Sequence, residues 1–235
     1  PLLDAAGVTL VLYGDVPLIR AETLRPLVTA AQEGKLALLT VELADPSGYG
    51  RIVRNPQGQV CRIVEEKDAT AEERCLREIN TGILAVATAK LRGWVAQLNN
   101  NNAQGEYYLT DVVGLAVRDG VVIEAFTVAE PEQVLGVNDR GQLAQLERFH
   151  QRRQAERLMR EGATLLDPAR VDVRGTLTTG KDVVIDVNVV FEGTVRLGDR
   201  VRIGSCCVLR DAIIGDDVEI LSHCRIEGAE VGAGS

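Results

Sequence analysis

The feature that most constrains the fold of this chain is a repeat of six residues in its C-terminal third. A period of six fits neither the 3.6 residues of an α-helical turn nor the two-residue alternation of a plain strand. It fits a strand that turns a corner every six residues, so that three units close one triangular coil. Steps of six, broken by two steps of five, connect an aliphatic or near-aliphatic residue at Val173, Thr179, Ile185, Phe191, Leu197, Ile203, Leu209, Ile214, Ile220, Ile226 and Val231.

The same repeat places glycine directly after many of these lead residues. The glycines are Gly180, Gly198, Gly204, Gly215 and Gly232. We expect the lead side chains to point inward, and Gly, Asn or Asp to occupy corners where φ is positive. Short antiparallel strands would not keep a phase of six over so many units. The pattern resembles the hexapeptide-repeat family of left-handed parallel β-helices, which we predict for residues 163–235.

A single helix is predicted for residues 139–162. Leu143, Leu146 and Leu158 recur on one side at helical spacing, and polar residues fill most of the remainder. Asn138 or Asp139 is a candidate N-cap, and Gly162 stands where a helix would end. This narrow apolar stripe favours an arm that joins two domains, although an ordinary surface helix would look the same.

Residues 1–138 are predicted to form an α/β domain. Apolar runs at 8–12, 36–43, 83–86 and 121–128 have the character of strands, and helical stretches at 21–33, 88–98 and 109–118 separate them. Strands that alternate with helices indicate βαβ units and a mostly parallel sheet. In such sheets, ligands bind outside the carboxyl ends of the strands.

Composition narrows the class of partner. The chain has 235 residues, a formal net charge of −8 and only 3% aromatic residues, which argues against a nucleic-acid partner. No run approaches the ~18 uncharged apolar residues of a membrane helix, and no signal sequence is apparent. Five cysteines without a signal sequence indicate reduced thiols and a cytoplasmic location. A small-molecule ligand is therefore the expectation.

The strongest local signal is Tyr13-Gly14-Asp15, which follows an apolar strand and precedes Pro17. A carboxylate at the ligand edge of a sheet suits Mg²⁺, which commonly takes one or two protein ligands and completes its shell with phosphates and water. Alternatively, Asp15 merely caps the turn. The residues alone leave these two readings open.

Three further segments place polar groups beside apolar strands. Gly48 and Gly50 flank a tyrosine in a loop, Glu65 and Lys67 follow one strand, and Asn80 and Thr81 adjoin another. A carboxylate and a carboxamide at one cleft suit sugar hydroxyls, which need both acceptors and donors. Taken singly, each segment has the character of a solvated strand end.

Six motifs occur in an order that resembles a known family, the bacterial bifunctional N-acetylglucosamine-1-phosphate uridyltransferases/glucosamine-1-phosphate acetyltransferases. The motifs are Tyr13-Gly-Asp15, Gly48-Tyr-Gly-Arg-Ile52, Val64-Glu-Glu-Lys-Asp68, Glu78-Ile-Asn-Thr-Gly82, the run from Asn99 to Tyr108, and Gly136-Val-Asn-Asp-Arg140. The helix and the hexapeptide repeat match that family's arm and β-helix, so the resemblance spans the whole chain.

The resemblance implies a Rossmann-like uridyltransferase (pyrophosphorylase) domain over 1–138, a linker helix over 139–162 and the first coils of an acetyltransferase β-helix over 163–235. Asp15 and Asn138 would hold Mg²⁺, and Tyr13 and Gly14 would line the nucleotide-sugar site. The residues that would contact UDP-N-acetylglucosamine are Gly50, Glu65, Asn80 and Asn138.

The implied reaction joins UTP and N-acetylglucosamine-1-phosphate to UDP-N-acetylglucosamine, with release of pyrophosphate, for cell-envelope synthesis. The intact protein would also N-acetylate glucosamine-1-phosphate with acetyl-CoA and would assemble as a homotrimer through the β-helix. The implied chemistry uses no covalent nucleophile, and no catalytic residue is assigned.

The sequence also departs from the family pattern. The glycine-rich Gly-x-Gly-Thr-Arg loop that cradles the triphosphate occurs nowhere in it. The family's acetyltransferase histidine lies in later coils, so His223 is not that base. Because the chain starts at Pro1 and stops at Ser235 within a repeat, we expect a fragment without turnover. Two alternatives stay open: a non-catalytic trimeric scaffold, and a pyrophosphorylase for another sugar or nucleotide.

Overall fold

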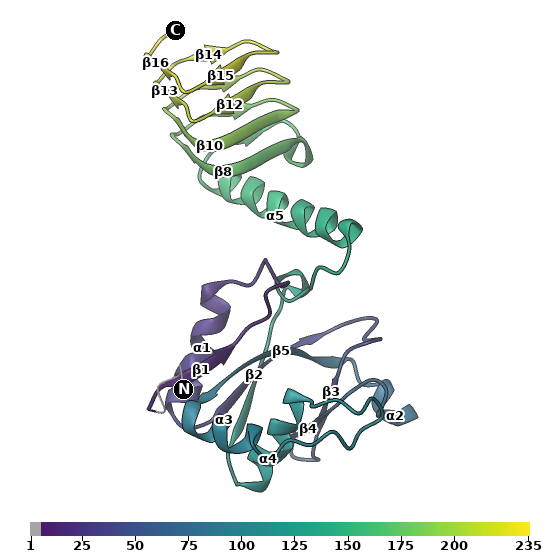
Figure 1. Ribbon diagram of the computed structural model, residues 1–235. Coiled ribbons are helices and arrows are strands. Elements are labelled where there is room, and N and C mark those ends of the chain that lie inside the picture. The colour runs from purple at the N-terminus through teal and green to yellow at the C-terminus, as the bar shows by residue number, and fades with distance from the viewer. Residues whose placement is uncertain (1–5) are drawn as a thin grey trace. The chain divides into compact units, whose positions relative to one another are not determined.

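The structure, a computed structural model, describes residues 6–235. The chain divides into two compact units, one that ends at Asp139 and one that begins at Arg140 (Figure 1). Among residues 6–235, no helix is both long enough and apolar enough to cross a membrane.

The first unit contains a sheet with helices on both faces. Its strands are β1 (Val8–Val11), β2 (Leu36–Glu42), β3 (Arg51–Arg54), β4 (Val60–Val64), β5 (Glu78–Ala87) and β6 (Ile123–Thr127). Its α-helices are α1 (Ala21–Gln32), α2 (Ala71–Arg74), α3 (Thr88–Val95) and α4 (Val112–Arg118). Single 3₁₀ turns occupy Leu109–Asp111 and Pro131–Gln133.

The prediction of a mostly parallel sheet is wrong for this unit. The strand order is β4-β3-β5-β2-β6, with β1 also paired to β5. Among the described strands of this unit, only β2 and β6 pair in parallel, because the long strand β5 runs antiparallel to β1, β2 and β3. A hairpin joins β3 to β4, and antiparallel strands of this kind need no helical crossover.

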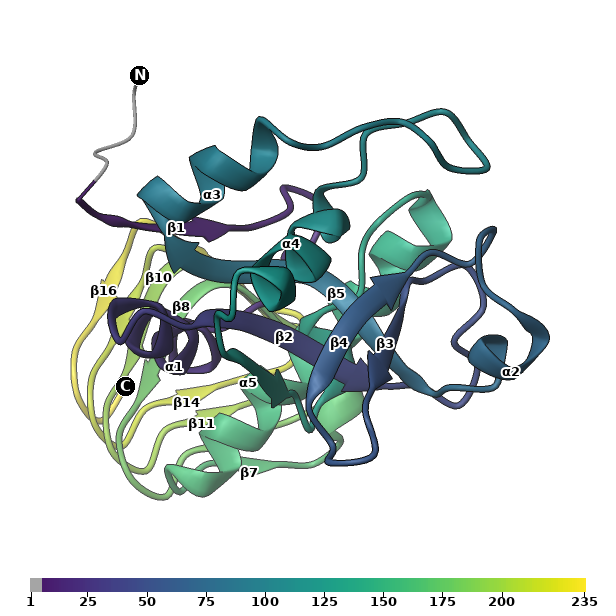
Figure 2. The ribbon, with the colours of Figure 1, turned by 90° about the horizontal axis from the view of Figure 1, so that it is seen from below.

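The alternation of side chains along the sheet divides the core into two layers. Leu36 and Leu38 of β2 join the cluster that includes Trp94 of α3 and Val113 of α4. The intervening residue Ala37 and the next residue, Leu39, join the opposite cluster, which is covered by α1. Figure 2 shows α4 beside β4. Because successive side chains of a strand point to opposite faces, both faces of the sheet are buried under helices. The edge of the sheet is therefore the part left for a binding site.

The second unit begins with helix α5 (Arg140–Arg160) and continues as a parallel β-helix (Figure 1). Its strands are β7 (Thr164–Leu165), β8 (Val171–Thr179), β9 (Val184–Ile185), β10 (Val189–Leu197), β11 (Arg202–Ile203), β12 (Val208–Arg210), β13 (Ile213–Ile214), β14 (Glu219–Ile220), β15 (Arg225–Glu227) and β16 (Glu230–Val231). A 3₁₀ turn covers Pro168–Arg170.

Helix α5 packs on the β-helix through its second half. Leu158 is fully buried in the β-helix core, and the Gln151 amide both donates to and accepts from the main chain of Val173. Leu143, which the sequence places on the same apolar side, is 53% exposed. The apolar stripe is therefore shorter than the spacing of leucines indicates.

The register between coils explains the irregular steps of the repeat. Val171 of β8 pairs with Val189 of β10, and Val190 pairs with Val208 of β12. The next pairing, Val208 with Arg225, is one residue shorter, which absorbs the five-residue step before Ile214. The predicted α/β fold class, a Rossmann-like nucleotidyltransferase domain followed by a hexapeptide β-helix, is confirmed.

Two details of the β-helix differ from the expectation. Several left-handed corners hold residues other than Gly, Asn or Asp, among them Arg200 (φ 57°) and Cys206 (φ 60°). The repeat glycines serve close stacking instead. A Cβ on Gly204 would lie 2.6 Å from the main-chain nitrogen of Ser222 in the next coil. Gly180, Gly198, Gly204 and Gly215 are therefore required by the close approach of the next coil rather than by their own φ.

Candidate functional site

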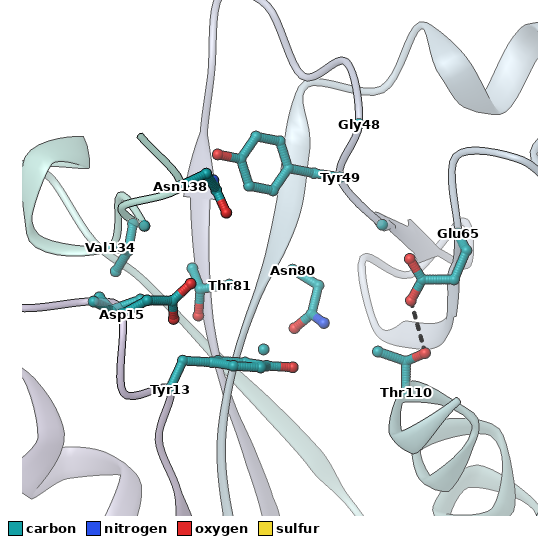
Figure 3. Close-up of a pocket in the computed structure, with 14 residues that line it drawn as sticks. Tyr13, Asp15, Gly48, Tyr49, Glu65, Asn80, Thr81, Thr110, Val134 and Asn138 are labelled. Atoms are coloured by element: carbon teal, nitrogen blue, oxygen red, sulfur yellow. Dashed lines mark hydrogen bonds between the residues drawn. The ribbon is translucent and has the colours of Figure 1, made fainter. Parts of the chain in front are cut away.

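Residues from six segments of the first unit line one cavity of about 260 Å³ (Figure 3). It contains six of the seven predicted site residues: Tyr13, Asp15, Gly50, Glu65, Asn80 and Asn138. Gly14 does not line the cavity and is exposed between two residues that do. Asp15 and Asn138 lie on one side, Glu65 and Thr110 lie on the opposite side, and Asn80 lies between them.

The Asp15 side of the cavity is built where β1 and β6 end. The N–H of Val137 donates to the main-chain oxygen of Asp15 at 2.9 Å, which joins the segments that carry Asp15 and Asn138. Gly136 leaves room beside the carboxylate, because a Cβ there would lie 3.4 Å from Asp15 Oδ2. This part of the sheet edge follows the rule that ligands meet the ends of parallel strands.

The middle of the cavity comes from an irregular part of β5. The register with β2 shifts between Leu38 and Thr40, and Gly82 adopts a φ of +79° at this point. Thr81 donates from its hydroxyl to the Leu39 carbonyl at 2.8 Å and also accepts from the N–H of Ile83. Strand irregularities of this kind re-aim side chains beside binding sites.

The opposite wall presents a carboxylate that is held by a hydroxyl. Thr110 Oγ1 donates to Glu65 Oε1 at 2.8 Å (Figure 3). The N–H of Asn80 donates to the Gly50 carbonyl at 2.8 Å, so the loop and β5 are joined beside Glu65. Lys67, which the sequence places with Glu65, does not line this cavity.

The donor set at the Asp15 side suits a magnesium ion. It consists of one carboxylate and one carboxamide, and Mg²⁺ prefers oxygen ligands and retains several water or phosphate ligands. Among residues 6–235, no group of three or more His, Cys, Asp or Glu side chains could form a metal site from protein ligands alone. The arrangement therefore fits an ion shared with a phosphate-bearing ligand.

Several lining residues are not among the seven predicted site residues, although the loop of Gly48 and Tyr49 and the segment of Thr81 already stand out in the sequence. These lining residues are Val16, Gly48, Tyr49, Thr81, Gly82, Thr110, Val134 and Gly136. Most of them lie within the six motifs and close in sequence to a predicted residue. Their nearness to that residue is the feature of the sequence that could have identified them. Thr110 has no such signal, because it follows the run that ends at Tyr108 and reaches Glu65 only through the fold.

A second cavity, of about 370 Å³, shares Glu65 and Thr110 with the first. Its lining includes Asp68, Tyr108 and Asp111. Burial, together with the negative charge of Asp68, raises the pKa of Asp111 above its ordinary value. Burial and the surrounding carboxylates likewise raise the pKa of Tyr108.

Comparison with known proteins gives a consistent set of relatives. The chain is 62% identical over 214 residues to the bifunctional protein GlmU of Thiobacillus denitrificans, covering 91% of this chain and 46% of that protein. It is 59% identical over 227 residues to GlmU of Methylococcus capsulatus (96% and 49%) and 58% identical over 233 residues to GlmU of Ralstonia pickettii (99% and 51%).

Two further comparisons add little. No protein-family model matches the chain. A solved structure of a Bacillus anthracis protein assigned as a glucose-1-phosphate thymidylyltransferase aligns with 53% of this chain and 47% of its own, at 20% identity and a TM-score of 0.41.

The alignments, at overall identities of 58–62%, cover 91–99% of the chain and so include both the α/β unit and the β-helix. The chain spans about half the length of the curated relatives it matches. Over that shared half, the resemblance of this chain to the family of the bifunctional protein GlmU is confirmed.

Proposed function

We propose that the intact protein carries out Mg²⁺-dependent uridylyl transfer from UTP to N-acetylglucosamine-1-phosphate. A phosphate oxygen of the sugar phosphate bonds to the α-phosphorus of UTP, the bond to the leaving phosphates breaks, and UDP-N-acetylglucosamine and pyrophosphate are the products. The observation that carries the proposal is the convergence of Asp15, Glu65, Asn80 and Asn138 on one cavity.

Phosphoryl transfer of this type asks a protein mainly for positioning and for neutralisation of charge. When bound between Asp15 and Asn138, Mg²⁺ would supply that neutralisation. The main-chain hydrogen bond from Val137 to Asp15 supports this role, because it joins the two segments whose side chains supply the carboxylate and the carboxamide. No covalent nucleophile is required.

Recognition of the sugar is assigned to the opposite side. Thr110 occupies Glu65 Oε1 and leaves Oε2 as an acceptor for a hydroxyl or an amide N–H of the ligand. The Asn80 carboxamide offers both a donor and an acceptor. Tyr13 and Gly50 complete the walls that would enclose the sugar.

The remaining parts of the proposal concern the intact protein. Its β-helix domain would transfer the acetyl group of acetyl-CoA to glucosamine-1-phosphate, and β-helices of three chains would associate. Both activities would supply cell-wall and lipopolysaccharide synthesis in the cytoplasm. The 235 residues contain no Gly-x-Gly-Thr-Arg segment, so we expect triphosphate binding, and hence turnover, to need residues outside this sequence.

The test uses the intact protein and this chain in parallel. With UTP, N-acetylglucosamine-1-phosphate and Mg²⁺, the intact protein should release pyrophosphate, and Asp15→Asn should abolish the release. This chain should release none but should bind UDP-N-acetylglucosamine. Absence of activity and of binding in the intact protein would refute the proposal and favour a scaffold.

A further inference from the structure

A buried guanidinium contacts a residue that lines the cavity, does not line the cavity itself and takes no part in the chemistry described above. Arg51, the first residue of β3, is 1% exposed and is the largest fully buried side chain among residues 6–235. Its Nη2 lies 2.7 Å from Glu66 Oε2, and its Nη1 donates to the Tyr49 carbonyl. Its Nε has no hydrogen-bond partner among the residues the structure describes.

A buried charge with an unpaired hydrogen-bond donor lowers the stability of the core that contains it. A buried ion pair often contributes no more to stability than well-packed apolar side chains of the same volume would contribute in its place. Arg54 on the same strand loses less hydration, since its side chain is partly exposed in its ion pair with Glu78. Neither residue of that pair lines the cavity. The location of Arg51 thus needs a reason other than stability.

The contacts of Arg51 supply that reason, because each one leads to a wall of the cavity. Tyr49 is itself a lining residue, and Glu66 follows the lining residue Glu65. Along the main chain, Arg51 pairs with Val64, which precedes Glu65, and with Ile79, which precedes Asn80. Arg51 is the point at which three lining segments are joined.

The hydrogen bond to Tyr49 also fixes a peptide plane. In a trans peptide the C=O and the following N–H point in opposite directions. Because the Tyr49 carbonyl is turned to the buried guanidinium, the Gly50 N–H is turned away from it. That N–H donates to no other described residue, and Gly50 lines the cavity.

We propose that Arg51 is a positioning residue: through Tyr49 and Glu66 it holds the Tyr49–Gly50 peptide and the Glu65 segment in the orientation that binds the ligand. This inference rests on the proposed function for the identity of the ligand. The claim that Arg51 orients the Tyr49–Gly50 peptide does not depend on the ligand, because it rests only on contacts within the chain.

The experiment compares Arg51→Met and Arg51→Lys with the matched control Arg54→Met, which removes an ion pair from the same strand. Titration with UDP-N-acetylglucosamine and Mg²⁺ should show affinity lower by about tenfold or more in Arg51→Met, because misplaced groups lose binding steeply. Arg51→Lys should be intermediate, since one ammonium cannot reproduce the planar fork. Arg54→Met should bind as the unsubstituted chain does.

A second readout needs no ligand. The NMR shifts of the Gly50 amide and the Tyr49 carbonyl should move in both Arg51 variants and stay in place in Arg54→Met. A purely structural role would instead lower the unfolding midpoints of Arg51→Met and Arg54→Met alike and leave these two resonances unchanged.

The outcomes separate the two claims. If the unsubstituted chain binds and the Arg51 variants bind equally well, the inference is wrong and the proposed function survives. If the unsubstituted chain does not bind, the proposed function is weakened, and the NMR comparison decides the inference. Should Arg51→Met fail to fold, Arg51→Lys and Glu66→Gln carry both measurements.

Discussion

The ring of Tyr13 lies directly against the main chain of Gly82, so closely that a Cβ on Gly82 would come within 1.9 Å of Tyr13 Cε2. Both residues line the cavity, and Gly82 adopts a left-handed φ of +79° within β5. The absence of a side chain at Gly82 therefore serves two purposes. It permits the irregular turn of the strand, and it lets the ring form one wall of the site.

Gly82→Ala should consequently displace the Tyr13 ring and weaken binding of UDP-N-acetylglucosamine. The left-handed conformation alone should cost about 1–2 kcal/mol of unfolding free energy. Gly58→Ala is the matched control, since Gly58 has a φ of +80° and no atom within 4 Å of a Cβ. Calorimetric titration and urea unfolding should show similar destabilisation in both variants but loss of binding only in Gly82→Ala. Equal binding by both would contradict the role given to Gly82.

Thr110→Val should weaken ligand binding and also lower the free energy of unfolding. The substitution keeps the volume of the side chain but removes the donor to the Glu65 carboxylate, a charge-assisted bond of about 1.5–3 kcal/mol. Thr110→Ser retains the hydroxyl and should restore most of the affinity. Thr29→Val, which removes a hydroxyl bond from the surface of α1, is the control. If Thr110→Val binds normally, Glu65 does not depend on Thr110 for its orientation.

The fold could be predicted from the sequence where it depends on local repetition. Each coil of the β-helix buries its own lead residues against the coil before it, so the period of six is visible in the order of residues such as Ile185, Phe191 and Leu197. The direction of β5 could not be predicted, because antiparallel pairing with β2 depends on partners over thirty residues away. Apolar runs indicate strands but not the direction in which they run.

The candidate site was predictable only where a motif contained it. Asp15, Glu65 and Asn80 belong to motifs, and the structure places them on one cavity. Thr110 and the ring contact between Tyr13 and Gly82 arise from tertiary packing, for which a single sequence carries no signal.

Glu78 should make stability depend on pH in the acid range. Burial by itself would raise the pKa of Glu78, but hydrogen bonds from Arg54, at 2.7 Å from both Nε and Nη2, lower it below its ordinary value of 4.5. A lowered folded-state pKa contributes stability that is present above about pH 4.5 and is lost as the pH falls through the folded value.

The measurement is the urea midpoint between pH 6 and pH 3 for the unsubstituted chain and for Glu78→Gln. The decline below pH 4.5 should be shallower in Glu78→Gln, since the amide cannot take up a proton in this range. Glu106→Gln, at an exposed carboxylate in a loop, should decline as the unsubstituted chain does. Parallel curves for all three proteins would show that the Arg54 pair contributes nothing.

Gly204→Ala should strongly destabilise the β-helix. Its Cβ would lie 2.6 Å from the Ser222 nitrogen and 3.0 Å from the Ile220 carbonyl, and main-chain atoms of a stacked coil cannot move independently. Gly232→Ala, at the equivalent position of the repeat, meets no atom within 4 Å in this chain. Thermal unfolding should therefore separate the two variants by several degrees. Similar midpoints would show that the coils can spread to admit a methyl group.

The central claim is that Asp15 and Asn138 hold a single metal ion beside the sugar nucleotide. Its most direct test is a crystal structure of this chain with UDP-N-acetylglucosamine and Mn²⁺, in which anomalous scattering locates the ion. The account predicts one peak within bonding distance of an Asp15 carboxylate oxygen, the Asn138 carboxamide oxygen and the phosphates of the ligand. A bound ligand whose metal ion contacts neither residue would contradict it.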